Sequence, residues 1–505
     1  MNQLKVGALL NYVAIVLNMA IGLLYTPFML RMLGQSEYGL YSLAASIIAY
    51  LTVLDLGFGN AIIRYTSKFH AEGKFEEQYQ MFGMFFIIYS CIGLIALVAG
   101  SILAVNAEYF FSAKMTGTEL GRMKIMLWLM TFNLAFTFPM SIWGSIMSAY
   151  ERFVFQRVVS IIRSVLNPVV MIALLVIGYK AVAIVVVTTI FNVLTLIINY
   201  WYCKHYLNIK LKFGSFKFCF FKEVSIYSFW IFLNAIMDRI YWSTGQFVLG
   251  IYKGTVAIAI YSVAIQLQQM YMMFSTAISS VFLPRVTSMV TKDNNEKDIS
   301  DLFIRTGRLQ YTVMAFILTA FVIFGQPFIN FWAGAGYEDA YIISLLFFVP
   351  LTVPLMQNIG IVILQARNQM RFRSLLYIFI ALGSLGISIP LSKYYSGIGC
   401  AIGTAIALTL GHIIIMNIYY SKKQHIDIIS FWKEIAKMSV VPLVFVIFYL
   451  LNSDFLLVNL STPINFLTGI FVFVLTYVPS FWLFSTNSEE KALVKVPLIK
   501  FLRRN

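Results

Sequence analysis

Long apolar stretches alternate with short charged clusters along almost the whole chain, and this pattern predicts membrane-spanning helices. A helix that crosses about 30 Å of hydrocarbon needs about 20 apolar residues. Fourteen such stretches extend approximately over residues 9–32, 38–63, 82–106, 124–148, 156–178, 180–202, 224–250, 255–283, 309–332, 340–365, 372–394, 397–420, 435–452 and 463–485. Because the stretches are continuously apolar rather than alternating, a lipid-spanning β-barrel is disfavoured. We therefore expect an all-α polytopic membrane protein with about 14 transmembrane helices.

Composition supports this interpretation. The 505 residues are 60% hydrophobic and only 11% charged, whereas about 25% charged residues are usual in soluble proteins. The first apolar stretch begins shortly after Lys5 and is too long for the apolar region of a signal peptide, and no small-residue cleavage site follows it. We expect an uncleaved first span and no ordinary soluble enzyme.

The positive charges divide unevenly between the two sides of the membrane. Of the 37 lysines and arginines, 28 lie in the connections on the side of the termini, 7 lie on the opposite side, and Arg163 and Arg239 lie within spans. Positively charged loops stay in the cytoplasm. We therefore predict that both termini are cytoplasmic. The net charge of +16 then sets topology and contacts anionic lipid, and we expect no nucleic-acid partner.

Two short matches indicate an internal repeat. Gly34 and the tetrapeptide YSLA at 41–44 correspond to Gly254 and YSVA at 261–264, an offset of 220 residues, and IMSA at 146–149 corresponds to ILQA at an offset of 217. An offset of six spans preserves orientation, so the repeats are parallel, with a pseudo-two-fold axis along the membrane normal. The predicted organisation is two six-helix bundles plus two C-terminal helices. Its parts are residues 1–203 as the first lobe, 204–222 as a cytoplasmic amphipathic linker, 223–421 as the second lobe, and 422–505 as two added helices with a basic cytoplasmic tail.

Ionisable side chains within apolar spans are candidate functional residues, because each costs about 2.5 to 3.5 kcal/mol on insertion scales. Asp55, Arg163, Asp238 and Arg239 lie in such positions. Asp55 is either a transport residue or the partner of an arginine on a neighbouring helix, and Arg163 either lines a cavity or is structural. Asp238 and Arg239 point about 100° apart on a helix, so at least one of them needs another partner.

Further polar positions have both a functional and a structural interpretation. Arg64 is a snorkelling anchor at the membrane surface or a ligand contact, and Gln266 and Gln269 line a path or link helices. The remaining cavity candidates are Arg31, Asn60 and Asn234.

Catalytic and cofactor motifs are not found in the sequence. The four cysteines stand singly without a zinc spacing, and no P-loop, H-E-x-x-H or nucleophile-elbow pattern occurs in a suitable context. We expect no metal, no cofactor and no enzymatic activity. Proton or sodium coupling through Asp55 or Asp238 stays open.

The N-terminal run YTPFMLRMLGQSEYGLY at 25–41, followed by LDLGFGN at 54–60 and Arg64, resembles the polysaccharide transport family of the O-antigen flippase type. That family belongs to the multidrug, oligosaccharidyl-lipid and polysaccharide exporter superfamily. YSVA at 261–264 and QAR at 365–367 are also similar to it.

The resemblance implies two six-helix lobes around a central cavity that flips an undecaprenyl-diphosphate-linked oligosaccharide from the cytoplasmic to the outer leaflet of the bacterial cytoplasmic (inner) membrane. It also implies a polysaccharide polymerase and chain-length machinery as partners. Burial and charge, rather than the motif, select Arg163 and Arg239 as diphosphate ligands, with Arg31 and Arg64 as entry and exit contacts. Alternatives are a peptidoglycan-precursor flippase and a multidrug or cation antiporter of the same superfamily. A membrane glycosyltransferase is disfavoured by the short outer loops.

Overall fold

The computed structural model describes residues 3–214, 218–292, 295–367, 369–452, 460 and 462–492. In this part of the chain the secondary structure is helical and contains no strand. By contacts the chain divides into two compact units. Unit 1 comprises residues 1–262 and 389–397, and unit 2 comprises residues 263–388 and 398–505.

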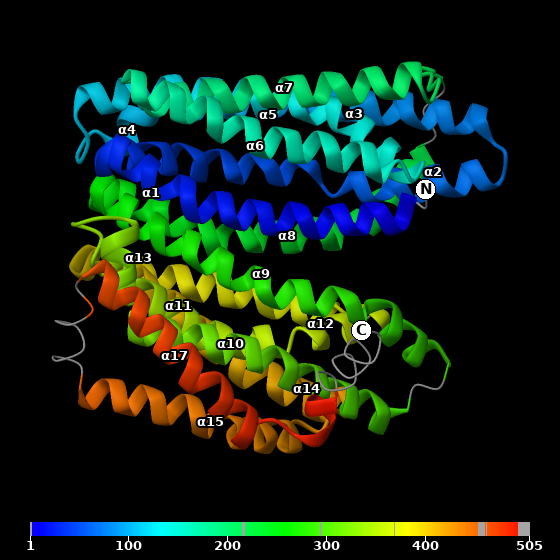
Figure 1. Cartoon of the computed structure of the whole chain (residues 1–505). Coiled ribbons are helices and arrows are strands. Elements are labelled where there is room, and N and C mark those ends of the chain that lie inside the picture. Colours follow the sequence, from blue (N-terminus) through cyan, green and yellow to red (C-terminus); the bar gives the residue numbers. More distant parts are fainter. Residues whose placement is uncertain are drawn as a thin grey trace, which may run out of the picture. The chain divides into compact units, whose positions relative to one another are not determined.

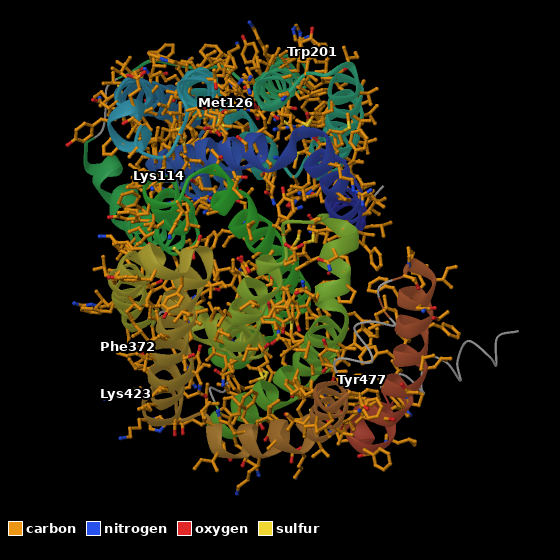
Figure 2. All side chains as sticks on the ribbon, turned by 90° about the vertical axis from the view of Figure 1, so that its left-hand side faces the viewer. Lys114, Met126, Trp201, Phe372, Lys423 and Tyr477 are labelled. Atoms are coloured by element: carbon orange, nitrogen blue, oxygen red, sulfur yellow. The ribbon has the colours of Figure 1, made fainter. Side chains whose placement is uncertain are left out.

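Unit 1 is built from long helices joined by short connections (Figure 1). Its elements are α1 (Gln3–Leu51), the 3₁₀ turn η1 (Thr52–Asp55), α2 (Phe58–Ala71), α3 (Phe75–Val105), α4 (Ala107–Phe111), α5 (Gly117–Ala149), α6 (Phe153–Ile177), α7 (Ala181–His205) and α8 (Phe218–Tyr252). Side chains between the helices are buried, as at Met126, whereas Trp201 points outward and is half exposed (Figure 2).

Helix α9 (Thr255–Lys292) runs from unit 1 into unit 2. The further elements are α10 (Glu296–Trp332), α11 (Asp339–Met356), α12 (Ile359–Ala366), α13 (Arg371–Leu408), the π-helical segment η2 (Thr409–Ile415), α14 (Met416–Gln424), α15 (Ile428–Leu451) and α17 (Pro463–Phe484). Residues 389–397 of α13 belong to unit 1.

The helices confirm a polytopic membrane protein. Within the described residues, 11 helical segments are long and apolar enough to cross a membrane. Two of them, Leu9–Ala71 and Arg371–Gln424, have 63 and 54 residues, enough for two crossings each at about 20 residues per crossing. Each contains a backbone break, at Gly34 (φ 75°) and at Ser396 (φ 53°). Together with α8, which has 35 residues, the observed helices are consistent with the predicted count of about fourteen.

The first repeated segment has a glycine with a positive φ angle in both copies. Gly34 and Gly254 both adopt positive φ angles, of 75° and 93°, a conformation that glycine takes without a steric penalty. The tetrapeptides that follow at 41–44 and 261–264 are buried, except for the half-buried first tyrosine of the earlier copy.

The second repeated segment also ends alike. Helices α5 and α12 end at the matching alanines of the two tetrapeptides. The amide of Arg152 donates to the carbonyl of Met147 at 2.9 Å, and the amide of Gln369 donates to that of Leu364 at 2.8 Å. Both donors and both acceptors are 217 residues apart. This correspondence supports an internal repeat. The predicted lobe boundaries at residues 203 and 223 stay a prediction, because the two compact units of the structure meet instead at residues 262 and 263.

The connections between the helices of unit 1 lie alternately at one end and at the opposite end of the unit. This alternation is the one that the order of the predicted spans requires. At one end, contacts join connections assigned to the outer side. They are those of Glu37 with Arg122 and the Ala181 amide, Glu119 with Thr255, and Lys393 with Tyr252. At the other end, contacts join connections assigned to the cytoplasm. They are those of Glu76 with Lys212, Gln78 with Tyr150, and Gln3 with the Val154 amide.

Two predicted connections differ from the structure. The span expected to end at residue 283 continues as α9 to Lys292, and α10 already begins at Glu296, so the predicted cytoplasmic connection between residues 284 and 308 is largely helical. The side chain of Asn295 accepts a hydrogen bond from the Lys297 amide and so caps α10, which lets the helix extend beyond its apolar part.

The expected amphipathic segment at 204–222 also differs where it is described. Residues 208–214 are not helical, and residues from Phe218 onward belong to α8. The Lys212 amide donates to the Tyr79 carbonyl at 3.2 Å, and its ammonium pairs with Glu76 at 2.6 Å. This part of the segment therefore packs on α3 rather than lying freely over a lipid surface.

The C-terminal helices are joined to α10 by an apolar cluster and a buried ion network. Tyr477 and Phe473 of α17 pack with Met438 of α15 and Phe324 of α10. Arg308 of α10 is 4% exposed, and it donates to three acceptors: Glu434 at 2.6 Å, Glu490 at 2.8 and 2.9 Å, and the Ser485 carbonyl at 3.3 Å. A guanidinium with this geometry orients every element that supplies an acceptor.

Candidate functional site

Arg163 is held within unit 1 by a hydrogen-bonded chain of amides that crosses three helices. Its guanidinium on α6 donates to the Oδ1 atom of Asn192 on α7 at 3.0 Å. The Nδ2 atom of Asn192 donates to Asn133 at 2.8 Å and to Thr137 at 2.7 Å, both on α5. Amides can satisfy hydrogen bonds but do not neutralise a charge. Within the described residues no carboxylate forms an ion pair with Arg163, so the site keeps a net positive charge.

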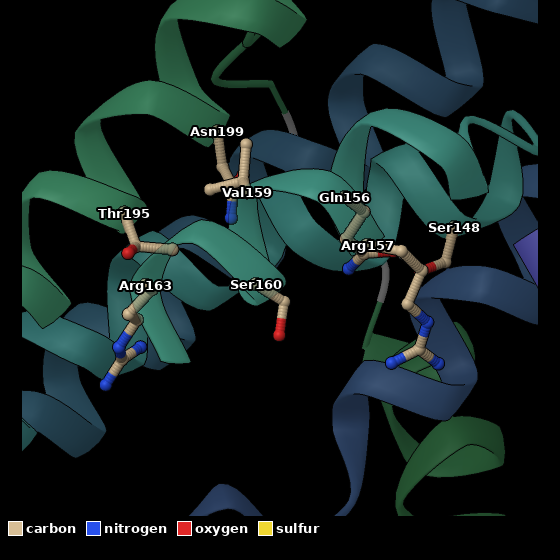
Figure 3. Close-up of a pocket in the computed structure, with 8 residues that line it drawn as sticks. All are labelled: Ser148, Gln156, Arg157, Val159, Ser160, Arg163, Thr195 and Asn199. Atoms are coloured by element: carbon tan, nitrogen blue, oxygen red, sulfur yellow. The ribbon is translucent and has the colours of Figure 1, made fainter. Parts of the chain in front are cut away.

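A recess of about 280 Å³ lies beside this chain (Figure 3). It is lined by Ser148, Gln156, Arg157, Val159, Ser160, Arg163, Thr195 and Asn199. Figure 3 shows the guanidinium groups of Arg157 and Arg163 and the hydroxyl of Ser160 on the same side of α6. We call this recess the α6–α7 pocket. Helical spacing explains its composition, because steps of three and four residues place side chains on one face of each helix.

One buried acceptor in the α6–α7 pocket lacks a hydrogen-bond donor in the described structure. Asn199 is 8% exposed and its Oδ1 atom has no partner. An unsatisfied buried polar atom costs about 1 to 3 kcal/mol. Two guanidinium groups, a serine hydroxyl and a free amide oxygen together suit an anion that also carries hydroxyl groups.

Asp55 does not line this pocket and is the last residue of the 3₁₀ turn η1, before the connection to α2. Leu56 and Gly57 adopt left-handed conformations with φ of 52° and 71°, which end one helix and start the next. The Asp55 side chain is half-buried and lies beside the hydroxyl of Tyr89 on α3 and the Gly57 backbone. Within the described residues no arginine forms an ion pair with Asp55, and both interpretations of this residue stay predictions.

The other predicted site residues are distributed over several elements. Arg31, Arg64 and Asn60 are exposed on α1 and α2, and the Arg64 guanidinium is 5.7 Å from the ring centroid of Tyr65. Such a contact fits an anchor at the membrane surface.

On α8, Asp238 and Arg239 are both exposed, whereas the Asn234 side chain lies outside the described residues. On α9, Gln266 is half-buried and Gln269 is exposed. The structure does not place these residues in the α6–α7 pocket, and their predicted roles stay predictions.

Several residues of the pocket are not evident from the sequence. In the sequence, Arg157 is one of many cations assigned to cytoplasmic connections. The asparagines Asn133, Asn192 and Asn199 are uncharged, so a search for charged residues in apolar stretches does not find them. Asn192 and Asn199 are seven residues apart and so share one face of α7. A search of the apolar stretches for neutral amides that share a helical face would have identified these two residues.

Comparison with known proteins agrees with this fold. A profile of the family described as "Polysaccharide biosynthesis protein" matches residues 4–290. The chain belongs to this family. It is also 20% identical over 404 residues to a Shigella flexneri protein named "Putative O-antigen transporter", covering 78% of this chain and 92% of that one.

Solved structures of membrane transporters share the architecture of this family member. The lipid II flippase MurJ in an inward closed conformation has a TM-score of 0.71 at 17% identity, with 95% of this chain and 99% of that one covered. An inward-facing multidrug transporter of the MATE family, from the MOP superfamily, has a TM-score of 0.60 at 14% identity, with 79% and 96% covered. At these identities the likeness establishes the fold.

Proposed function

We propose that this protein is a flippase that moves an undecaprenyl-diphosphate-linked oligosaccharide across the bacterial cytoplasmic membrane by alternating access, with both termini in the cytoplasm. The observation that carries the proposal is the α6–α7 pocket, where Arg157 and Arg163 are not neutralised by a carboxylate within the described residues. Membership of a polysaccharide biosynthesis family supports the substrate class.

The energetic reason for such a protein is the polarity of the substrate. Each polar group left unpaired in hydrocarbon costs several kcal/mol, and an isolated charge costs far more. Unassisted flipping of a diphosphate with several sugars is therefore negligibly slow. A guanidinium matches the geometry of phosphate oxygens with two parallel N–H donors, so Arg163 replaces part of the water shell that the diphosphate loses.

The volume of the pocket limits what it can hold. A water molecule occupies about 30 Å³ of liquid, so a recess of about 280 Å³ accommodates a diphosphate or one sugar but no whole oligosaccharide. We infer that the pocket binds the charged head, while the prenyl chain stays in lipid. Ser160, Thr195 and Asn199 then offer hydrogen bonds to phosphate or to the first sugar.

Coupling to a proton or sodium gradient is a separate part of the proposal. Asp55 and Asp238 are the candidate coupling residues. Asp55 is the better placed of the two, because it is half-buried beside Tyr89 at the end of the 3₁₀ helix η1, where a change of protonation would alter how α1 and α2 are joined.

A peptidoglycan-precursor flippase is the second candidate function. The observation that favours it is the similarity in fold to the lipid II flippase over 95% of the chain. Both candidates transport a polyprenyl-diphosphate-linked saccharide, so the pocket does not distinguish them. A multidrug antiporter that takes cations is opposed by the positive charge of the pocket.

The test uses a deletion strain complemented with variants. We expect the deletion to leave lipid-linked repeat units on the cytoplasmic leaflet, and Arg163→Ala to lower export about tenfold or more, with Arg163→Lys intermediate. Arg152→Ala is the matched control, because Arg152 is an exposed cation next to the start of α6 but does not line the pocket. The readouts are surface polysaccharide and the leaflet position of the lipid-linked unit.

Three other outcomes would change the proposal. Normal polysaccharide export with new sensitivity to cationic drugs would refute the flippase. Rescue of a strain depleted of its peptidoglycan-precursor flippase would select the second candidate. Equal export by the Arg163 and Arg152 variants, at equal protein levels, would remove the α6–α7 pocket from the transport path.

A further inference from the structure

A second positively charged recess lies in unit 2, at the end of a helical hairpin. The first part of α13 packs against η2 and α14, and the rings of Phe372 and Tyr419 stack at a centroid distance of 4.1 Å and an angle of 7°. Beside the stacked pair is a recess of about 650 Å³ lined by Gln369, Arg371, Phe372, Leu375, Tyr419, Lys423 and Gln424. Phe372 and Lys423 appear together at the surface in Figure 2. We call it the hairpin recess.

The polar floor of the hairpin recess is ordered by hydrogen bonds. Gln424 is only 2% exposed, and it accepts from the Arg367 guanidinium at 3.0 Å and donates to Gln369 at 2.6 Å. These amides satisfy one another and fix the end of α14. Arg371 and Lys423 are exposed beside them, and neither forms an ion pair within the described part of the chain.

The stretch of sequence that supplies the lining of the recess contains no acidic residue. Residues 340–426 contain no aspartate and no glutamate. The same stretch contains the cations Arg367, Arg371, Arg373, Lys393, Lys422 and Lys423. The lining of the recess thus carries Arg371 and Lys423 and no carboxylate, and a recess with this charge attracts an anion.

Apolar side chains continue from the cations along both helices of the hairpin. On α13, Leu375 and Phe379 follow Arg371 in steps of four residues and are 41% and 71% exposed. On the other helix, Ile415 is 40% exposed and precedes Tyr419 and Lys423 in the same steps. Steps of four place residues on one helical face. Each helix of the hairpin therefore carries a cation at one end of a face, Arg371 or Lys423. Exposed apolar side chains continue along the same face, Leu375 and Phe379 on α13 and Ile415 on the other helix.

We propose that the hairpin recess binds an anionic phospholipid of the surrounding leaflet. The phosphate lies between Arg371 and Lys423, and an acyl chain lies along the stripe formed by Leu375 and Phe379. The aromatic pair between them suits the depth at which aromatic residues line a membrane surface. A soluble anion would use the cations alone, whereas the adjoining apolar stripes fit a ligand with a charged head and a hydrocarbon chain.

The test is native mass spectrometry of the full-length protein in detergent, with phosphatidylglycerol or phosphatidylcholine added. Each surface cation contributes about 1 kcal/mol to binding of anionic lipid, or about fivefold. We expect the wild type to retain one more phosphatidylglycerol molecule than the double variant Arg371→Ala/Lys423→Ala. The affinity of the double variant for phosphatidylglycerol should fall about 25-fold. Retention by the wild type should weaken at high salt. Lys393→Ala is the control, because Lys393 lies on the same helix away from the recess.

Each other outcome would overturn the proposal. Equal retention of phosphatidylglycerol by the double variant and the wild type would show that the recess binds no lipid. Equal retention of phosphatidylcholine would show that charge does not select the ligand. Displacement of phosphatidylglycerol from the recess by a polyprenyl diphosphate would assign it to the transported substrate. A matched melting temperature without lipid confirms that the double variant folds.

Discussion

Arg163 illustrates what a single residue reveals in a sequence and what it does not. A charge in an apolar stretch is conspicuous, so the amino-acid order alone identifies this position. Its partner Asn192 is not conspicuous, because one amide costs little in a membrane helix and is common at helix contacts. Which amide meets which arginine depends on how α6 and α7 are rotated, and rotation is set by packing of the whole bundle.

The amide chain gives a prediction for Asn192. Asn192→Leu removes the acceptor of the Arg163 guanidinium and the donor to α5, and hydrogen bonds to charged groups are worth about 1.5 to 3 kcal/mol. We expect export to fall about tenfold because Arg163 is no longer held toward the pocket. A double-mutant cycle with Arg163→Ala measures this coupling. If the two substitutions have additive effects on export, Asn192 does not position Arg163.

At the scale of elements, the continuous apolar stretches of the sequence predicted where helices occur. They did not predict the residues at which the helices begin and end. All fourteen apolar stretches are largely helical in their described parts, because hydrocarbon forces backbone groups to pair within a segment. Outside hydrocarbon this constraint ends. That is why the polar residues 296–308 resemble a loop in the sequence, although an Asn295 cap and good helix formers extend α10 there.

The close approach of α1 and α9 gives a second prediction. A Cβ atom at Gly39 would overlap the backbone carbonyl of Thr255, which cannot move like a flexible side chain. Gly39→Val should therefore separate the two helices and lower the melting temperature by roughly 5 °C or more. Gly121→Ala is the control, since nothing lies within 4 Å of its Cβ position and alanine favours a helix. Equal melting temperatures for both variants would mean that the contact does not support the fold.

The ion network of Arg308 gives a third prediction. Removal of one partner from a buried ion pair costs about 3 to 5 kcal/mol, so Arg308→Ala should strongly lower thermal stability. Arg305 is half exposed and 3.7 Å from Glu489, and exposed pairs contribute about 0 to 1 kcal/mol, so Arg305→Ala should have little effect. Melting curves of the two variants in detergent make the comparison. A similar shift for both would contradict a stabilising role of the buried network.

At the scale of the whole molecule, the sequence predicts an internal repeat from two short matches. Short tetrapeptides of common apolar residues can match by chance. The repeat is better supported because the helices that end at these tetrapeptides also close with equivalent hydrogen bonds, Arg152 to Met147 and Gln369 to Leu364. The compact units could not be predicted in the same way. Contact between helices depends on conformation, and a repeat in sequence does not specify which helices touch.

The orientation of the protein gives a fourth prediction. With both termini cytoplasmic, the connection around Lys114 faces outward and the one around Lys74 faces inward. In a background without the four native cysteines, Lys114→Cys should react with an impermeant thiol reagent in intact cells. Lys74→Cys should react only after the membrane is permeabilised. The reverse result would invert the assignment made from the lysine and arginine distribution.

The buried guanidinium of Arg308 also bears on biosynthesis. Its carboxylate partners, Glu434 and Glu490, are translated long after α10 itself, and the second of them lies near the end of the chain. Until that point the nascent protein holds a cation in an apolar setting without these counter-ions. The network thus distinguishes a chain that includes Glu490 from one that ends before it, and we expect the shorter chain, with its incompletely paired charge, to be degraded faster.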